Sequence, residues 1–390
     1  FLIRKYDLED DKLRGISRTC DQGEELDAEI RIIDEFRDLN NSQVFEHVFG
    51  RRMMALRRGV TVPRSPSDFL GVDSRELMYP SLRETLHSVI NDNAVSKDIN
   101  ELHLLDVGAG SGEAIDWFFA KELEGWACAK EEDTKNRKIF IHAIEPNPTF
   151  LKAYQQKLLE YQYLNQGMVY QGPIQDYLGN VCSETLPMPP VPVDFIFDLQ
   201  KYLRTDFKKP NIDPKQDIIK FITFSYGLLK PGGAIYIAFL DMSSAFASLA
   251  CKFYEEIVGD FETPKRISQT IKARNELLYE GNILEFLLGD AEQKEKTRPK
   301  LISHRSPSGF FARTLSDMAV LALSELLEIG DSKFDKRALD FMITQLKLAV
   351  RTPGEKKPFG LTKCIRGGEN VWRVDHSLII CVIRKELMID

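Results

Sequence analysis

An acidic residue and three alternating glycines form the segment LLDVGAGSG, residues 104–112. Asp106 lies near the end of an apolar run, and Gly108, Gly110 and Gly112 follow it at every second position. Because glycine has no Cβ, such a turn lets backbone N–H groups approach an anion or a nucleotide closely. We therefore expect Gly108 and Gly110 to lie against a ligand and Gly112 to let the next helix pack tightly. A tight strand-to-helix turn without a ligand is the competing interpretation.

The glycine spacing distinguishes between kinds of nucleotide site. A dinucleotide fingerprint reads GxGxxG and has an acid roughly 20 residues later, whereas this turn reads GxGxG, with Glu113 where the last glycine would stand. A P-loop needs Gly-Lys followed by Ser or Thr, and that sequence is absent here. The spacing therefore disfavours a dehydrogenase and a P-loop enzyme.

Glu145 is the next acid at the end of a predicted strand, KIFIHAIE, residues 138–145. A carboxylate at the carboxyl end of a strand can accept hydrogen bonds from both hydroxyls of a ribose. Glu145 is therefore predicted to bind a nucleoside sugar. A surface acid that caps the following helix is the alternative.

The elements that must position these residues alternate along the chain. Apolar runs are separated by segments with helical spacing, the order that builds a parallel, doubly wound sheet. The expected strands are 101–107, 138–145, 168–172, 193–200 and 234–242, and the expected helices are 79–92, 111–123, 148–162 and 217–229. The helix over 79–92 has Ser81 as its expected N-cap. Near the end, GGEN at 367–370 predicts a hairpin turn.

Composition limits the classes of function. The chain has 390 residues, a net charge of −7 and a pI near 5.6, which argue against a broad basic face for nucleic acid. No apolar run approaches the roughly 20 residues of a membrane helix. The six cysteines form no CxxC pair, as expected for reduced thiols in a cytoplasmic protein. The chain begins with Phe1, so we expect further sequence upstream.

Five segments resemble, in order, the landmarks of class I S-adenosylmethionine (SAM) methyltransferases. LHLLDVGAGSG resembles motif I, AIEPN carries the acid for the ribose, GPIQDY occupies the adenine-contacting position, and VDFIFDLQ and LLKPGGAIYIA resemble the last two parallel strands. The resemblance implies SAM as cofactor and S-adenosylhomocysteine as product. It implies that these residues bind the cofactor: Asp106, Gly108, Ala109, Gly110, Gly112, Glu145, Pro146, Gln175, Asp176, Leu199 and Gln200.

A fold and a division of the chain follow. We predict an α/β fold of the class I methyltransferase type, with a mainly parallel, seven-stranded, Rossmann-like sheet, a C-terminal antiparallel hairpin and added helices. Residues 1–95 are expected to form a helical cap that binds substrate, and 96–242 the SAM-binding core. Residues 243–345 are expected to be a helical lid, and 346–390 the strands that complete the sheet.

Within that superfamily the sequence is most similar to histamine N-methyltransferases. AIEPNPTFLKAYQQKL, DFIFDLQKYL and VDHSLIICVI carry this similarity. Gln200 matches an active-site glutamine of that family, and Tyr202 lies one position away from its active-site tyrosines. The family's asparagine pair falls on Asp375 and His376. The resemblance implies transfer of a methyl group to a nitrogen of a small-molecule amine, with Gln200, Tyr202, Asp375 and His376 around the acceptor.

Methyl transfer from a sulfonium needs an aimed nucleophile and exclusion of water, and it needs no metal. An amine acceptor must arrive deprotonated, so a nearby base helps. His376 is the candidate base because histidine titrates near neutral pH, with Asp375 and Gln200 as catalytic partners. Purely structural roles stay open for the same residues: Gln200 could cap a strand, His376 and Tyr202 could be core residues, and Asp375 could be a charge at a sheet edge.

Two other classes compete with a small-molecule enzyme. A protein or RNA methyltransferase would use the added helices for docking, although the NPPY or DPPY tetrapeptide of many such enzymes is replaced by DLQKY. A non-catalytic SAM-binding subunit is the third possibility. We expect a monomer or homodimer with a small-molecule amine as partner and no nucleic acid or membrane.

Overall fold

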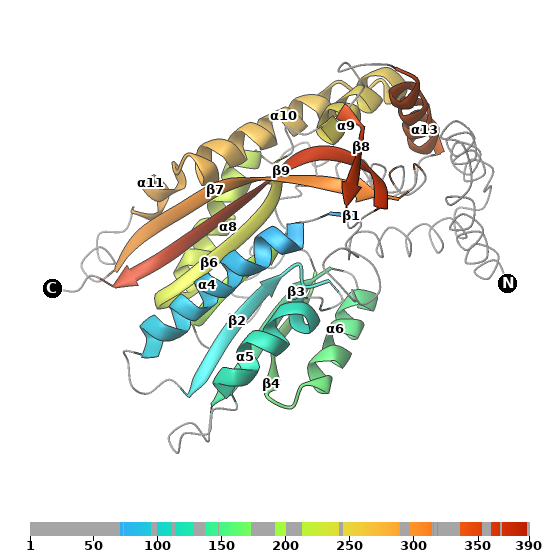
Figure 1. Ribbon diagram of the computed structural model, residues 1–390. Helices are drawn as coiled ribbons and strands as arrows, with labels where there is room; N and C mark the ends of the chain where they lie inside the picture. Colours follow the sequence, from blue (N-terminus) through green and yellow to red (C-terminus); the bar gives the residue numbers. More distant parts are fainter. Residues whose placement is uncertain are drawn as a thin grey trace.

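The computed structural model describes residues 71–72, 74–94, 100–110, 112, 114–127, 137–146, 148–172, 192–199, 213–241, 245–288, 297–313, 315, 318, 336–352, 360–366 and 369–387. One twisted β-sheet runs through the described part, with helices on both of its faces (Figure 1). Among the described residues, no helix is long and apolar enough to cross a membrane.

Five parallel strands form one half of the sheet, in the order β4-β3-β2-β5-β6. They are β2 (Glu101–Val107), β3 (Lys138–Glu145), β4 (Leu164–Gln171), β5 (Val193–Leu199) and β6 (Leu229–Asp241). Most of these strands are nearly continuous apolar runs because helices cover both faces of a parallel sheet. The predicted strands 101–107 and 138–145 are confirmed to the residue, and β4 and β6 begin earlier than predicted.

An antiparallel strand separates β6 from the next parallel strand. β9 (Glu369–Leu387) pairs with β6 on one side and with β7 (Thr297–Ala312) on the other. β8 (Thr362–Arg366) forms the predicted hairpin with β9, and β1 (Gly71–Val72) pairs with the end of β7. Without the short β1 and β8, the seven long strands follow the order 3-2-1-4-5-7-6 in chain numbering, with the seventh reversed. This order confirms the predicted Rossmann-like fold of the class I methyltransferase type, in a sheet of nine strands rather than seven.

The prediction that residues 243–345 form a helical lid is wrong in its second half. β7 takes Thr297–Ala312 into the sheet, and helices occupy only the flanking parts that the structure describes. Pro299 and Pro307 concealed this strand, because proline lacks the N–H of a sheet ladder. β7 tolerates them since most of its length pairs on one side only, with β9. The expected boundary at residue 346 also falls inside a helix, α13 (Lys336–Arg351).

Two helical layers cover the sheet (Figure 1). One face carries α4 (Ser74–Ala94), the π-helical turn η2 (Ile115–Phe119) with α5 (Ala120–Ala127), and α6 (Pro148–Glu160). The other carries α8 (Pro214–Leu228), α10 (Glu262–Arg274), η5 (Asn275–Tyr279) and α11 (Ile283–Leu287). The helices α9 (Ala245–Phe253) and α13 and the turn η4 (Tyr254–Val258) add to the first of these cores.

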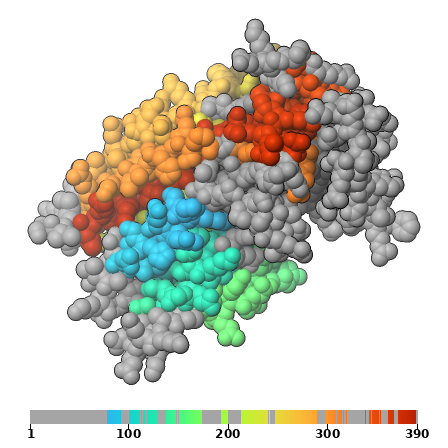
Figure 2. All heavy atoms as spheres, in the orientation of Figure 1, coloured from blue at the N-terminus to red at the C-terminus, as the bar shows by residue number. Residues whose placement is uncertain are grey.

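The α4 helix ties the start of the described chain to its end. It begins at Ser74, so the prediction of Ser81 as N-cap is wrong. Ser81 lies inside the helix, and its carbonyl accepts a hydrogen bond from the Thr85 hydroxyl. Arg384 of β9 donates to the hydroxyl of Ser88. In Figure 2 this helix, in blue, lies next to the orange and red residues of the last strands. Residues 1–70, most of the predicted N-terminal cap, lie outside the described residues.

A pair of buried imidazoles, His103 and His142, and a backbone N–H join β2, β3 and β4. The Met168 N–H donates to Nδ1 of His142 at 2.8 Å, which leaves the proton of neutral His142 on Nε2. That Nε2 lies 3.1 Å from Nδ1 of His103. Burial, and secondarily the adjacent His103 ring, lower the pKa of His142 to about 4. Both rings are therefore neutral at pH 7, and protonating either one would place two N–H groups face to face.

This pair should make the fold sensitive to acid. The pKa of His142 is lower in the folded chain than in the unfolded chain, so the unfolded chain binds more protons between pH 6.5 and 4. We expect the stability contribution to be complete above pH 6.5 and to fall by roughly 2–3 kcal/mol as the pH drops toward 4. Urea unfolding of wild type and His142→Gln across this range would measure it, with the exposed His304→Gln as control. Parallel pH profiles for wild type and His142→Gln would contradict the expectation.

Candidate functional site

The site lies where the strand order reverses. From β2 the chain proceeds outward to β3 and β4, and then returns to add β5 on the other side of β2. Val107 pairs with Asp198 at the carboxyl ends of β2 and β5. In open parallel sheets, the loops that leave such a pair diverge and create a ligand crevice at the carboxyl edge. The glycine turn starts directly after Val107, so it lies at this edge.

The glycine turn is fastened to the end of β3. Gly108, Gly110 and Gly112 have φ values of +69°, +58° and +83°, a conformation that other residues rarely adopt. The N–H groups of Gly108 and Ala109 both donate to the Ile144 carbonyl, at 2.8 and 3.1 Å. The turn then leads into η2, which is the π-helical start of the helix predicted at 111–123. The chain therefore needs glycine here to make the turn.

Glu145 holds the turn in place. Its Oε2 accepts a hydrogen bond of 2.8 Å from the Gly110 N–H, and the side chain is only 5% exposed. The alternative of a surface acid does not fit, since the carboxylate is buried against the turn. The sequence placed Glu145 at the end of a strand, and the structure brings it together with Gly110. Contact with a ribose stays a prediction.

The two ends of the turn differ in the space around them. A Cβ added at Gly112 would lie 3.2 Å from Cδ of Lys157 and 3.3 Å from side-chain atoms of Ile115 and Tyr154. A Cβ added at Gly110 would meet no atom of the described residues within 4 Å. This confirms that Gly112 serves close packing. In the part of the chain that the structure describes, the space over Gly110, where the sequence predicts a ligand, is open.

This difference gives opposite expectations for two alanine variants. Both need alanine at positive φ, which costs about 1–2 kcal/mol. Gly112→Ala adds overlap with three side chains, so we expect a further loss of about 1–2 kcal/mol of unfolding free energy. Gly110→Ala should keep more stability and lose more affinity for a ligand lying on the turn. Thermal unfolding and SAM titration of both variants would test this, and equal effects on both quantities would refute it.

Asp106 shares a face of the sheet with Glu145. It is buried in β2, and its charge acts on the fully buried phenol of Tyr154 in α6. Leu199 lies half-buried at the end of β5, packed against the same core, and Pro146 is exposed after β3. Four predicted cofactor or acceptor residues lie outside the described residues: Gln175, Asp176, Gln200 and Tyr202.

Asp375 and His376 do not form a pair. Neighbouring residues of a strand point to opposite faces, and here His376 is 7% exposed while the Asp375 side chain is 65% exposed. Asp375 makes an ion pair with Arg373. The His376 ring packs on Phe310, with ring centroids 4.5 Å apart. Only His376 therefore faces the core side of the sheet.

His376 lies at the same edge of the sheet as the glycine turn. Its neighbour Ser377 pairs with Asp241, the last residue of β6, so His376 extends just past the carboxyl end of the parallel strands. β9 is three strand positions from β2, roughly 14 Å at ordinary strand spacing. His376 therefore lies at the same edge as the glycine turn, but three strand positions away from the strand that leads into it.

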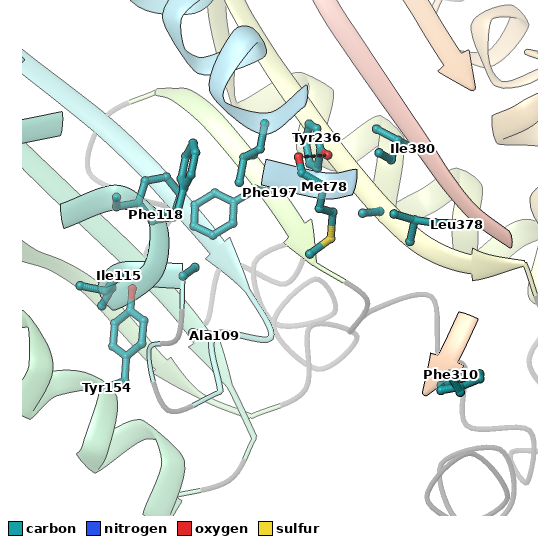
Figure 3. Packing of buried hydrophobic residues seen from close by; sticks show 14 of the residues in the cluster. Met78, Ala109, Ile115, Phe118, Tyr154, Phe197, Tyr236, Phe310, Leu378 and Ile380 are labelled. Carbon is teal, nitrogen blue, oxygen red and sulfur yellow. Dashed lines mark hydrogen bonds between the residues drawn. The ribbon is translucent and has the colours of Figure 1, made fainter. Parts of the chain in front are cut away.

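Sequence reasoning missed Tyr154 as part of the site, because its helical spacing with Leu151 and Leu158 reads only as core. Its ring lies against Gly112, and the close-up in Figure 3 shows it near Ile115. The crowding of a Gly-x-Gly-x-Gly turn against the next helix was the available signal. Within the described ranges, no group of three His, Cys, Asp or Glu side chains could hold a metal.

Comparison with known proteins finds weak structural similarities only. No known family profile matches this sequence, and no curated protein matches it either. A Bacillus halodurans structure classed as a methyltransferase is 12% identical, covering 77% of this chain and 99% of that chain, with a TM-score of 0.36. An O-methyltransferase from Bacillus cereus in complex with S-adenosylhomocysteine is 12% identical (70% and 93% covered, TM-score 0.32). The O-methyltransferase TomG from Streptomyces achromogenes in complex with SAM is 17% identical (67% and 88% covered, TM-score 0.30). At these identities and TM-scores the likeness says nothing about the reaction of this chain, whose fold class rests on its own strand order.

Proposed function

We propose that this chain is a SAM-dependent methyltransferase. One observation carries the proposal: the buried Glu145 carboxylate is hydrogen-bonded to the Gly110 N–H at the switch point of the sheet. The acceptor for a ribose and the turn that receives the rest of the nucleoside are therefore one preorganised unit. The GxGxG spacing and the acid at the end of β3 suit SAM better than a dinucleotide or a nucleoside triphosphate.

SAM, when bound, would supply an electrophilic methyl group for in-line displacement. The residues of this chain would hold it: Glu145 at the ribose, Gly110 beneath the nucleoside, and Asp106 on the side of β5. The chain then needs only to aim the acceptor and exclude water. The cytoplasmic location and the monomeric or homodimeric state expected from the sequence belong to the same proposal.

The proposed acceptor is a nitrogen of a small-molecule amine. Its support is the resemblance to histamine N-methyltransferases together with the placement of His376 at the carboxyl edge, beyond the reach of the glycine turn. A histidine there can take the proton of an ammonium before transfer. The net charge of −7 suits a cationic acceptor better than a polyanion.

Removing the imidazole should slow transfer without loosening SAM. We expect His376→Ala to lower kcat about a hundredfold, the usual contribution of a positioned general base, and to change SAM affinity less than twofold. His304→Ala, an exposed histidine of β7, is the matched control. A pH–rate profile completes the measurement. In wild type the rate should rise with pH as the base loses its proton, and this rise should be absent in the variant. Equal losses of rate and affinity would remove His376 as the base.

Methyl transfer in a cell extract would test the activity itself. SAM with a labelled methyl group is added with the protein, and the small-molecule, protein and nucleic-acid fractions are counted. Label in small molecules supports the amine acceptor and supplies it for identification. Label in protein or RNA overturns the small-molecule acceptor. Binding of SAM without any label supports a non-catalytic subunit, and absence of SAM binding overturns the proposal.

A further inference from the structure

Tyr154 is built into the wall beneath the glycine turn. It lies on the buried face of α6, the helix that follows β3. Its ring is fully buried, and its Cδ2 would stand 3.3 Å from a Cβ on Gly112. Figure 3 shows the ring rising from α6 with its hydroxyl toward the helix start that carries Ile115. Moving Tyr154 would therefore disturb the turn.

The hydroxyl of Tyr154 is a buried donor left unused. Its oxygen is buried, and no hydrogen-bond partner for it occurs in the part of the chain that the structure describes. Buried hydroxyls in proteins almost always have a partner, either in the protein or in an ordered water. The buried phenol of Tyr236 in β6 follows this rule, since it donates to the Met78 carbonyl at 2.9 Å (Figure 3). The Tyr154 hydroxyl departs from this rule.

The charge next to Tyr154 is that of Asp106. Burial, and then the negative charge of Asp106, raise the pKa of Tyr154 well above its ordinary value of 10. The phenol therefore stays protonated at any physiological pH and can act as a donor. A protonated hydroxyl close to a buried carboxylate is the setting in which an ordered water bridges the two groups.

We propose that Tyr154 is a positioning residue of the cofactor site, whose hydroxyl donates to a water shared between the Asp106 carboxylate and the amino-acid end of the bound ligand. The proposal rests on the proposed SAM site. The order of the strands indicates which end of the ligand lies over which strand. Glu145 on β3 takes the ribose, so the part beyond the sulfur extends toward β2, where Asp106 lies and from where its charge acts on the Tyr154 phenol. Tyr154 then holds the carboxylate that meets the ligand's ammonium group.

Two ligands that differ only in the amino-acid end provide the test. S-adenosylhomocysteine has this end and 5′-methylthioadenosine lacks it, while both keep adenine, ribose and sulfur. We expect Tyr154→Phe to weaken S-adenosylhomocysteine about fivefold to tenfold, as for one lost hydrogen bond, and to leave 5′-methylthioadenosine within twofold. A purely structural role would weaken both ligands equally. Calorimetric titration of each ligand with each variant gives the ratio.

Tyr236→Phe is the matched control. It removes a hydroxyl that has a partner, so the unfolding midpoint of the ligand-free protein should fall while the ratio of the two affinities stays constant. Tyr154→Phe removes a hydroxyl without one, so its midpoint should stay constant or rise. Asp106→Asn, measured in both the wild-type and Tyr154→Phe backgrounds, gives a second reading. The two substitutions should be non-additive for S-adenosylhomocysteine if the residues act together.

The outcomes separate this inference from the proposed function. If wild type binds neither ligand, the SAM site and the role of Tyr154 fall together. If wild type binds both and Glu145→Gln weakens both, the SAM site stands. In that case, equal affinity ratios for wild type and Tyr154→Phe, or additive effects with Asp106→Asn, overturn the positioning role alone.

Discussion

Replacing Glu145 by alanine should lower the affinity for SAM by about 2–4 kcal/mol, at least thirtyfold. Two losses add in this variant. The ribose loses a charged acceptor, and the buried Gly110 N–H loses the oxygen that it reaches at 2.8 Å. The second loss loosens the turn on which the nucleoside lies. Isothermal titration of SAM into both proteins measures the effect.

Glu145→Gln separates the two losses. The amide oxygen can still accept from Gly110, so the turn should keep its conformation and the loss should shrink to the part due to charge, about 1–2 kcal/mol. The thermal midpoints of the ligand-free proteins should follow the same order, with Glu145→Ala lowest. If the alanine variant binds SAM as wild type does, Glu145 is not in the site.

Replacing Asp194 by alanine should cost about 3 kcal/mol or more of unfolding free energy. Asp194 is fully buried at the start of β5. Its Oδ2 accepts a hydrogen bond from the backbone N–H of His103 and lies 2.8 Å from Nζ of Lys230. Removing one member of a buried ion pair leaves the other without compensation, and the His103 N–H also loses its acceptor. Because the Lys230 side chain is 29% exposed, its ammonium can turn partly to solvent, which limits the loss.

A surface pair provides the comparison. Lys300 and Glu386 lie 2.9 Å apart between β7 and β9, with both side chains exposed, so Glu386→Ala should cost less than about 1 kcal/mol. Asp194→Asn keeps an acceptor for His103 and should fall between the two. Urea unfolding of the three variants, with constant m-values, measures the series. A loss for Asp194→Ala no larger than that for Glu386→Ala would mean that this buried contact does not stabilise the sheet.

The sequence was most informative where a local pattern and the fold agree. The runs ELHLLDV and KIFIHAIE could be predicted as strands because a parallel strand buried on both faces needs continuous apolar residues. The turn from Asp106 to Gly112 was equally predictable, since three positive φ values require glycine. The position of Glu145 at the end of the next strand was then predictable, because the carboxyl ends of parallel strands lie at the same edge of the sheet.

Long-range pairing could not be predicted from local patterns. β7 carries two prolines and several charges, and it is a strand mainly because β9 pairs along its whole length. Asp375 and His376 separate because they are neighbours in a strand. Which of the two faces the core depends on the packing of β9, which the letters DHS do not fix. Tyr154 has the spacing of a core residue. That its hydroxyl lacks a hydrogen-bond partner among the described residues depends on tertiary packing, which the sequence does not show.

The position of β9 also bears on how the protein is made. β9 follows both of its long neighbours in the chain, yet it lies between them in the sheet. During synthesis, β6 and β7 therefore emerge from the ribosome with one long edge each unsatisfied, and they stay so until Glu369–Leu387 has been translated. Exposed strand edges recruit other strands. Nascent chains that stop before residue 369 should consequently depend on chaperones, and messages truncated there should yield aggregates rather than a smaller folded protein.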